Sequence, residues 1–470
     1  MKSSATLFSS VCIAALLCLY FIIATNYYFS LGLLPQFFPY DSKRILELFV
    51  LMAGLLLLML TPELRRCYLD LFFSLPLFIR LSCLGILCLG LISSGLAPLP
   101  KMALMEVATF ACLFFFTFLI ACLRLIWQEN FDLWALRLFF AAITCYIVYF
   151  FWIYIISILL KNAFTQIPGF MNIRVFAHYL AWTLPILLIP LFSKNSRAML
   201  IFVALIALLW WSLFWVESAK ALLLAYGAAV MISLVLFKKP AIKPMLVCCT
   251  FAFAGFILYS LYFLLIQHFL HGTIALNTMH DSVDVRWKLW KLSWHYIQLH
   301  PWLGLGPLHF GYYTNPWASG PSNGYLSIAT QWGIPTFLLC LMIGVYSLRK
   351  WIRFVKKQDQ VQLYFLSLSL FGALFDMLAS GILNTPISQL LMVIVIGWML
   401  GIYFGKTKII KASIYANFLW LICLSAVCAL IWLLPPQLST LTQREVAWHY
   451  RHPQAIYFPT YWLQGWINEP

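Results

Sequence analysis

Apolar stretches separated by short polar segments run through almost the whole chain. Most are about as long as the roughly 17 to 25 residues that a helix needs to cross a hydrocarbon core of about 30 Å. The pattern therefore predicts the fold class, an all-α polytopic membrane protein with about 12–13 transmembrane helices. The stretches lie near residues 8–29, 45–61, 78–96, 102–122, 134–160, 175–193, 198–216, 219–237, 244–267, 333–348, 361–381, 388–405 and 412–434.

One long polar interruption and one polar tail break this pattern. The interruption covers residues 268–332, and the tail covers residues 435–470. The sequence has no Gly/Ser-rich linker or low-complexity tract, so we expect a single membrane domain over residues 1–434 that carries the interruption as a loop. Loops this long within a compact protein are usually functional, so we expect the chemistry to concentrate there.

The positions of the basic residues predict the orientation of the helices. Lysine and arginine are enriched in cytoplasmic loops, and the densest clusters, residues 349–357 and 406–411, agree with each other across two intervening stretches. We therefore expect a cytoplasmic N-terminus, with the long loop and the tail outside. No small-residue cleavage site follows the first stretch, so we expect it to be retained as a span.

Composition limits the possible partners and sites. With 64% hydrophobic and 9% charged residues, the chain lacks the polar surface that soluble domains need. The net charge of +16 follows mostly from the membrane orientation, so we expect anionic lipids rather than nucleic acid as partners. Most of the 13 cysteines lie in apolar stretches without metal-ligand spacing, so we expect neither a metal site nor a disulfide framework.

Residues 285–299 of the loop predict an amphipathic helix. Trp287, Trp290 and Trp294 interleave there with basic side chains, which is typical of a helix at a membrane interface. The tryptophans are then simply anchors. Arg286 has a second interpretation, because an arginine next to a membrane-embedded cavity can bind phosphate through two parallel hydrogen bonds.

The two prolines and two glycines among residues 300–307 predict a turn after this helix. Gly304 and Gly306 would allow a ligand to approach the backbone closely, although an ordinary turn is the simpler explanation of both glycines. Further along, Asn323 could cap the helix of the amphipathic stretch Ser327 to Trp332.

Two further basic residues lie at outer helix ends, Arg174 at the start of the sixth stretch and Lys220 at the outer end of the eighth. Each could extend to the lipid headgroups, or both could join Arg286 in a site for pyrophosphate. Asp376, in the middle of the eleventh stretch, is either paired within the bundle or functional.

The loop resembles that of the O-antigen ligase and O-antigen polymerase superfamily of bacterial envelope glycosyltransferases, which includes pilin O-oligosaccharyltransferases. That loop has an arginine, a tryptophan a few residues on, a Pro-x-x-Gly-x-Gly turn, and His-Asn-x-x-Leu followed by a glycine. The similarity covers about residues 165–345. The matching residues here are Arg286, Trp290, Pro301 to Gly306, Ser322 to Leu326 and Gly333, with Ser218 to Ala221 and Gly169 to Asn172 upstream.

The resemblance implies a multi-pass protein of the bacterial inner membrane that needs no metal, cofactor or nucleotide sugar. It would transfer a glycan from an undecaprenyl-pyrophosphate carrier to an acceptor hydroxyl in the periplasm. Arg286 and Lys220 would stabilise the pyrophosphate leaving group, because cations placed where charge develops are effective catalysts. The residues expected to bind substrate are Arg174, Trp290, Gly304, Gly306, Asn323 and Tyr325.

This sequence departs from the family pattern at two positions. Lys220 replaces an arginine, which keeps the charge but loses the planar fork. Ser322 replaces the loop histidine, and a serine cannot be the base that an acceptor hydroxyl needs near neutral pH. Either another loop histidine is the base, with His309 and His300 nearest in sequence, or the acceptor chemistry differs, or catalysis has been lost.

Several functions are compatible with these features. Within the family the acceptor can be the lipid A core, a second lipid-linked repeat unit or a pilin-like protein, and we favour a ligase or oligosaccharyltransferase over a polymerase. A transporter of lipid-linked sugars would have charges and helix breaks spread through its spans, whereas here they gather at one outer face. A non-catalytic scaffold for envelope assembly would fit the missing histidine.

The polar tail is rich in aromatic residues. They could stack on sugar rings, or they could anchor the tail at the membrane interface. The tail residues in question, with the arginine that lies among them, are Trp448, His449, Tyr450, Arg451, His452, Tyr457, Tyr461 and Trp462.

Overall fold

The computed structural model describes most of the chain, and every regular element in the described part is a helix. The described residues are 4–26, 34, 36–160, 167–170, 172–193, 196–216, 220–265, 283–313, 318–358, 360–407, 418–451, 460–463 and 465–467.

The α-helices follow the predicted apolar stretches closely. They are α1 (Ser4–Thr25), α3 (Pro39–Leu60), α4 (Pro62–Phe73), α5 (Leu77–Leu96), α6 (Pro100–Trp127), α7 (Glu129–Leu159), α8 (Ile173–Thr183), α9 (Arg197–Val216), α10 (Lys220–Phe237), α11 (Lys239–Tyr259), α13 (Val283–Leu299), α14 (Gly324–Gln358), α15 (Val361–Asp376), α16 (Pro386–Gly405) and α17 (Phe418–Arg451). Shorter turns of other helix types are η1 (Ile186–Phe192), η2 (Ser260–Leu265) and η3 (His309–Tyr312).

The prediction of a polytopic membrane protein is confirmed. Among the described residues, ten helices are long and apolar enough to cross a membrane, or up to eleven if α3 and α4, which are bent by 100° at their junction, count as one span. The apolar helices at Ala221–Phe237 and Val361–Asp376 are shorter. Every one of the thirteen apolar stretches therefore contains a helix.

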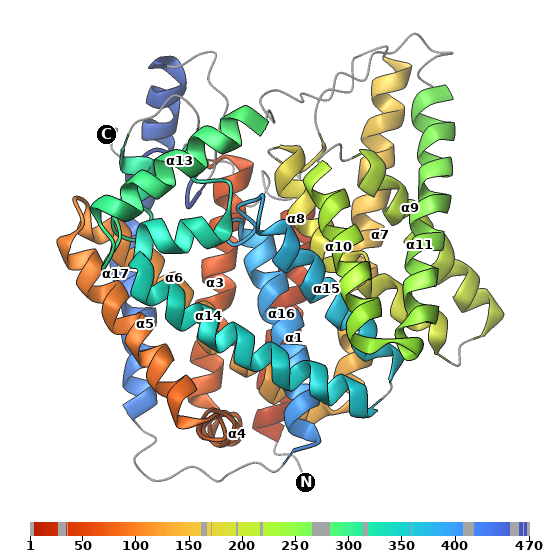
Figure 1. Ribbon diagram of the computed structural model, residues 1–470, viewed down its shortest axis with the longest axis horizontal. Coiled ribbons are helices and arrows are strands. Elements are labelled where there is room, and N and C mark those ends of the chain that lie inside the picture. Colours follow the sequence, from red (N-terminus) through yellow and green to blue (C-terminus); the bar gives the residue numbers. More distant parts are fainter. Residues whose placement is uncertain are drawn as a thin grey trace.

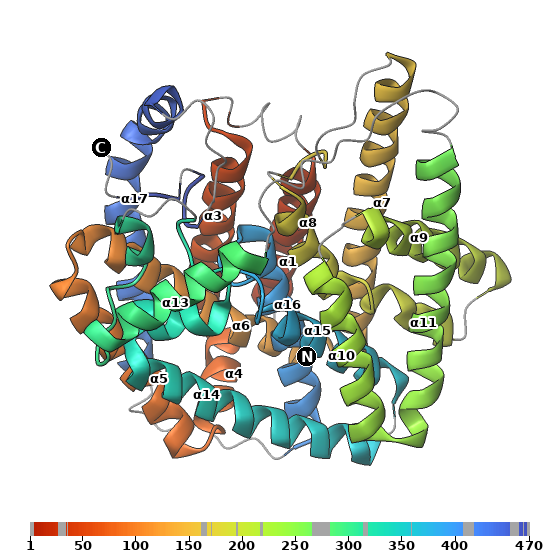
Figure 2. The ribbon, with the colours of Figure 1, turned by 45° about the horizontal axis from the view of Figure 1, so that its top comes forward.

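The helices form two groups with a central layer between them. Helices α7, α9, α10 and α11 lie on the right of Figure 1, whereas α3, α4, α5, α6 and α17 lie on the left. Helix α14 begins on the left and crosses towards the lower end of α10. Helices α1, α8, α15 and α16 lie between the groups in both ribbon views (Figures 1 and 2). The central layer is tightly packed, because α8 packs against both α15 and α16 and the latter packs along α6.

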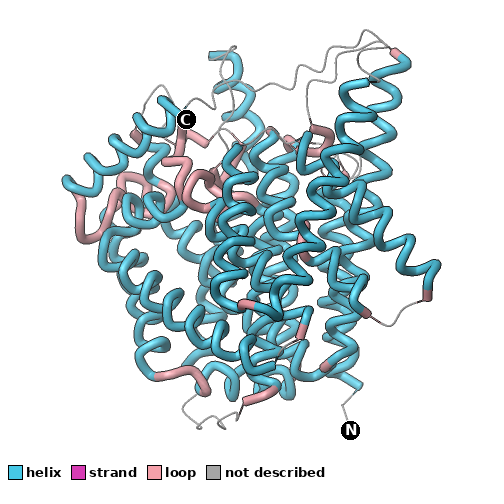
Figure 3. Tube along the Cα trace, turned by 45° about the vertical axis from the view of Figure 1, so that its right-hand side comes forward, coloured by secondary structure: helices cyan, strands magenta, loops and turns pink. Residues whose placement is uncertain are grey.

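Most loops of the described part of the chain lie on one side of the helix bundle (Figure 3). The start of α1 and the basic end of α14 lie at the bottom of Figure 1, whereas α13 and the C-terminal end of α17 lie at the top. Most of the described loops are at this upper side (Figure 3). The sequence patterns expected to carry chemistry therefore lie together, opposite the basic end of α14.

The turn after α13 is docked on a break in α14. The backbone N–H groups of Leu305 and Gly306 donate to the carbonyl oxygens of Thr330 and Gln331, at 2.9 and 3.1 Å. In return, Ile334 donates to Pro301 O at 2.8 Å. The glycines of the turn thus approach the protein's own backbone closely, which fixes the loop on the bundle.

Gly333 makes this docking possible. It interrupts α14 with a φ of 85°, in the region that L side chains rarely adopt, and an added Cβ would overlap the carbonyl group of Trp302. A side chain here must therefore both strain the backbone and push the turn away.

We expect Gly333→Ala to lower the free energy of unfolding by at least about 2 kcal/mol, because it adds backbone strain and overpacking. Gly344→Ala is the matched control in the same helix, since a Cβ there would meet no atom within 4 Å. It should be neutral or stabilising by up to about 1 kcal/mol. Thermal unfolding of both variants in detergent measures the difference, and equal melting temperatures would contradict the docking argument.

The C-terminal residues return to the bundle rather than extending from it. Helix α17 continues through Pro435 and Pro436 to Arg451, beyond the predicted end of the last span. Tyr461 and Trp462 are buried, as is Trp448, whereas Tyr450 is 87% exposed. The buried rings are thus unavailable for stacking on a sugar, while the side chain of His449 and all of His452 and Tyr457 lie outside what the structure describes.

Candidate functional site

Several of the predicted site residues meet near the connection between α15 and α16, residues 377–385. Asn323 accepts a hydrogen bond at Oδ1 from Leu326 N (3.0 Å), so it caps α14 as one interpretation of the sequence predicted. Its Nδ2 also donates to Leu378 O at 2.7 Å. Tyr325 fastens the same helix start through its hydroxyl, which donates to Leu374 O at 3.1 Å. Asn323 and Tyr325 therefore tie the end of the long loop to the end of α15.

Arg286, on α13, interacts with the end of α15. Its side chain is half-buried, and it lies near enough to Asp376 for the two charges to interact. The Asp376 carboxylate is buried at the end of α15 and accepts a hydrogen bond from Ser380 Oγ at 2.5 Å. The central acidic residue is thus paired within the bundle. Trp290, one turn after Arg286, is also half-buried.

Helix α8 reaches this connection from the opposite side. Asn172 caps the helix by accepting from Val175 N at 2.9 Å, which places Arg174 in the first turn. One turn later the buried ring of His178 places Nδ1 3.2 Å from Thr385 Oγ1. Because residues four apart share a helix face, Arg174 is on the side of α8 that faces the start of α16.

The remaining predicted residues are placed less directly. Lys220 is the first residue of α10, a helix that packs against α15, but its side chain lies outside the described part of the structure. Gly304 and Gly306 contact α14 and the α5–α6 turn, so backbone packing accounts for both. Ser322 is half-buried directly before the cap of α14, with a φ of 50° in the left-handed region.

His309 is buried and both of its ring nitrogens face backbone groups. Nε2 accepts from Leu99 N at 3.0 Å, and Nδ1 lies 2.7 Å from Pro307 O, to which it donates in the tautomer that satisfies both contacts. Burial lowers the pKa of His309, so the ring stays neutral near pH 7. In this arrangement His309 holds the loop on the α5–α6 turn, and neither nitrogen is free to take a proton.

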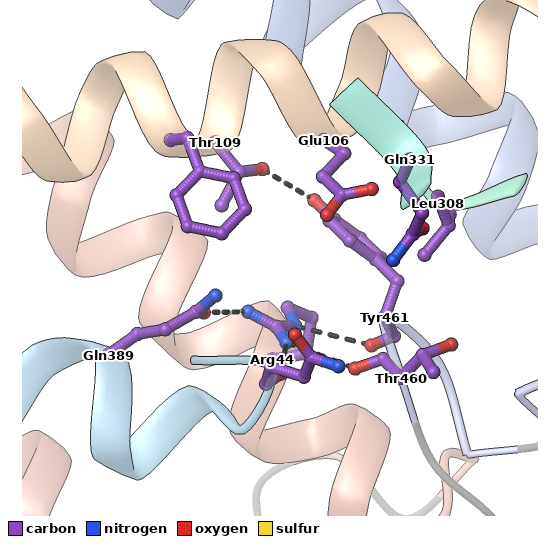
Figure 4. A pocket seen from close by; sticks show the side chains of 10 residues that line it. Arg44, Glu106, Thr109, Leu308, Gln331, Gln389, Thr460 and Tyr461 are labelled. Atoms are coloured by element: carbon purple, nitrogen blue, oxygen red, sulfur yellow. Dashed lines mark hydrogen bonds between the residues drawn. The ribbon is translucent and has the colours of Figure 1, made fainter. Parts of the chain in front are cut away.

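A small pocket lies beside the docked turn (Figure 4). Its lining combines residues of several helices, the loop and the tail. It has room for about one or two groups the size of a water molecule. The residues that line it are Arg44, Glu106, Thr109, Phe110, Leu308, Gln331, Asn384, Gln389, Thr460 and Tyr461.

Arg44 supplies the positive charge of this pocket, and its guanidinium is extensively paired. It forms a buried ion pair with Glu47 at 2.5 Å. It also donates to Gln389 Oε1 and Asn384 O, and through Nε to Tyr461 O at 3.2 Å. One cation thus joins α3, α16, the α15–α16 connection and the tail.

Glu106 points into the same pocket from α6 (Figure 4). It is 9% exposed, and its Oε2 has no hydrogen-bond partner among the described residues. Neither Glu106 nor the Arg44–Glu47 pair was among the residues predicted from the sequence. The available signal was the cost of placing charge within an apolar span, which makes such residues functional or structural candidates wherever they occur.

The comparisons with known proteins bear on the long loop. Residues 182–341 match the family model described as O-Antigen ligase. The matched stretch includes Lys220, Arg286, the docked turn and the cap of α14, whereas Arg174 lies just before it. No curated protein matches the chain.

Proposed function

We propose a specific glycan-transfer reaction for this protein. The match of residues 182–341 to the O-antigen ligase family model supports ligase-type transfer in general. The protein transfers a glycan from an undecaprenyl-pyrophosphate carrier to an acceptor hydroxyl, without a metal or a nucleotide sugar. The observation that carries this proposal is Arg286, a half-buried cation in the matched region, beside the capped start of α14 and the end of α15.

The chemistry of the leaving group explains why cations are needed at this place. When the glycosidic bond to the carrier breaks, negative charge develops on the pyrophosphate. Arg286 is our candidate for binding it, with Lys220 and Arg174 as further cations from α10 and α8. Cations that the fold already holds in place do not have to move as the negative charge develops. They therefore stabilise the transition state more than the ground state.

We further propose that this side of the bundle is the periplasmic face of the bacterial inner membrane. The basic end of α14 and the start of α1 share the opposite side, as expected if both are cytoplasmic. The carrier's isoprenoid chain would then remain in the bilayer, with its pyrophosphate at the level of α13. Lipid A core or a protein hydroxyl is the acceptor we favour.

A reconstituted assay tests the proposal. The purified protein is mixed with undecaprenyl-pyrophosphate-linked glycan and, in separate reactions, lipid A core, a second lipid-linked repeat unit or a pilin-like protein, all in the presence of EDTA. Transfer to one acceptor with release of undecaprenyl pyrophosphate supports the reaction. Transport of the lipid-linked glycan across a vesicle without any transfer would overturn it.

A further inference from the structure

The base that removes the proton from the acceptor is the part of the reaction that the loop leaves unassigned. Ser322 cannot take the proton, and both nitrogens of His309 already face backbone groups. A base must instead be a titratable side chain with an unused acceptor atom next to a space that the hydroxyl can enter. Glu106 meets both conditions, because its unpartnered Oε2 borders the pocket beside the docked turn.

The pocket is built to orient a hydroxyl group. Thr109 Oγ1 and the hydroxyl of Tyr461 lie 2.7 Å apart on its wall, and the amide of Gln331 is held by Ser327 Oγ at 2.6 Å. These are neutral donors and acceptors, held in place by their own hydrogen bonds. The free space fits about one or two water-sized groups, so it suits a hydroxyl or hydroxymethyl group rather than a whole sugar ring.

A cation lies across the pocket from Glu106. That cation is Arg44 (Figure 4). For a buried carboxylate, burial disfavours the ionised form that accepts a proton, and an opposite charge works against this effect. The strong ion pair of Arg44 is formed with Glu47, so the free oxygen of Glu106 is not consumed by that cation.

The pocket is connected to the candidate pyrophosphate site through two shared segments. Gln331 is on α14, the helix that Asn323 caps, and Leu308 belongs to the loop that follows α13. Asn384 is in the α15–α16 connection, which also contains the Ser380 partner of Asp376. Groups bound at the two places would therefore be held by the same loop and the same connection.

We propose that this pocket binds the acceptor hydroxyl and that Glu106 is the general base, an inference that rests on the proposed function. The hydroxyl oxygen forms a bond to the anomeric carbon of the glycan while the bond from that carbon to the pyrophosphate oxygen breaks. The pyrophosphate leaves with the electron pair, and the proton of the hydroxyl passes to the Glu106 carboxylate. Atoms and charge balance without an additional reactant.

The test is Glu106→Gln in the reconstituted assay, because glutamine keeps the shape but cannot accept the proton. We expect the rate of transfer to fall about 10²- to 10⁴-fold, as is typical for loss of a general base. The dissociation constant for the lipid-linked donor should stay within about twofold of the wild-type value. If the ionised Glu106 is the base, the transfer rate of the wild type should fall at acid pH, and the glutamine variant should not show this fall. Glu129→Gln, which neutralises an exposed carboxylate at the start of α7, is the control and should transfer normally.

Glu106→Asp keeps a carboxylate and separates chemistry from packing. If Glu106 is the base, the aspartate variant should transfer at least about tenfold faster than the glutamine variant. Equal rates for the two variants, or donor affinity that falls in parallel with the rate, would overturn the role of Glu106. A wild-type protein that transfers to no acceptor would overturn the proposed function first, and this inference with it.

Discussion

Arg286→Ala is expected to lower glycan transfer by at least about a hundredfold while the protein still inserts and folds. A single preorganised group that stabilises developing charge is worth about 10²- to 10³-fold in rate. Arg286 is half-buried beside the end of α15, where its charge is less screened than in bulk water. The measurement is the initial rate of undecaprenyl-pyrophosphate release, with saturating acceptor.

Two further variants show whether charge or geometry matters. Arg286→Lys keeps the charge but not the planar fork, so its rate should fall between those of the wild type and the alanine variant. Lys291→Ala removes an exposed cation from the same helix and should transfer normally. Wild-type rates in Arg286→Ala would exclude the proposed pyrophosphate site.

The helices could be predicted from sequence because one physical requirement dominates them. A membrane-spanning helix must satisfy its own backbone hydrogen bonds and cover about 30 Å with apolar side chains. Its length and position therefore follow from the local sequence. The amphipathic segment that became α13 and the cap at Asn323 are local in the same sense. Each depends on residues within about one helix turn of one another.

The pocket could not be predicted because its contacts are not local. Arg44 and the backbone oxygen that it binds on Tyr461 are 417 residues apart in the chain. The role of Gly304 could not be predicted for the same reason. A glycine in a turn allows either a ligand or another backbone segment to lie close to it, and the sequence pattern is the same in both cases. The fold places the backbone of Gln331 there.

His309 shows why a titratable residue in a loop is weak evidence for a catalyst. Its proximity in sequence to the docked turn was the reason for considering it as the base. Because it lies so close to this turn, His309 has its Nδ1 next to Pro307 O. The fold places Leu99 N next to its Nε2. The catalytic role of His309 stays a prediction, and any proton transfer by it must first break one of these backbone hydrogen bonds.

Arg44→Met should be the most destabilising of the single substitutions considered. The Arg44–Glu47 pair is buried, with side chains 1% and 0% exposed, so removal of the cation leaves an uncompensated carboxylate within the bundle. Breaking a buried pair in this way costs about 3–5 kcal/mol. It also removes a donor to the tail at Tyr461 O, which leaves that backbone carbonyl without this partner. Thermal unfolding in detergent, with the exposed Arg349→Met as control, measures the loss.

A double variant separates the charge from the packing. If Arg44→Met lowers the free energy of unfolding mainly because it strands the Glu47 carboxylate, then adding Glu47→Gln should restore part of the lost stability. A neutral amide is much less costly to bury than a carboxylate. We expect Arg44→Met with Glu47→Gln to melt above Arg44→Met alone but below the wild type, since the bonds to the tail and to Gln389 remain lost. A double variant that is no more stable than Arg44→Met would mean that the lost bonds to the tail and to Gln389, and not the stranded carboxylate, account for the loss of stability.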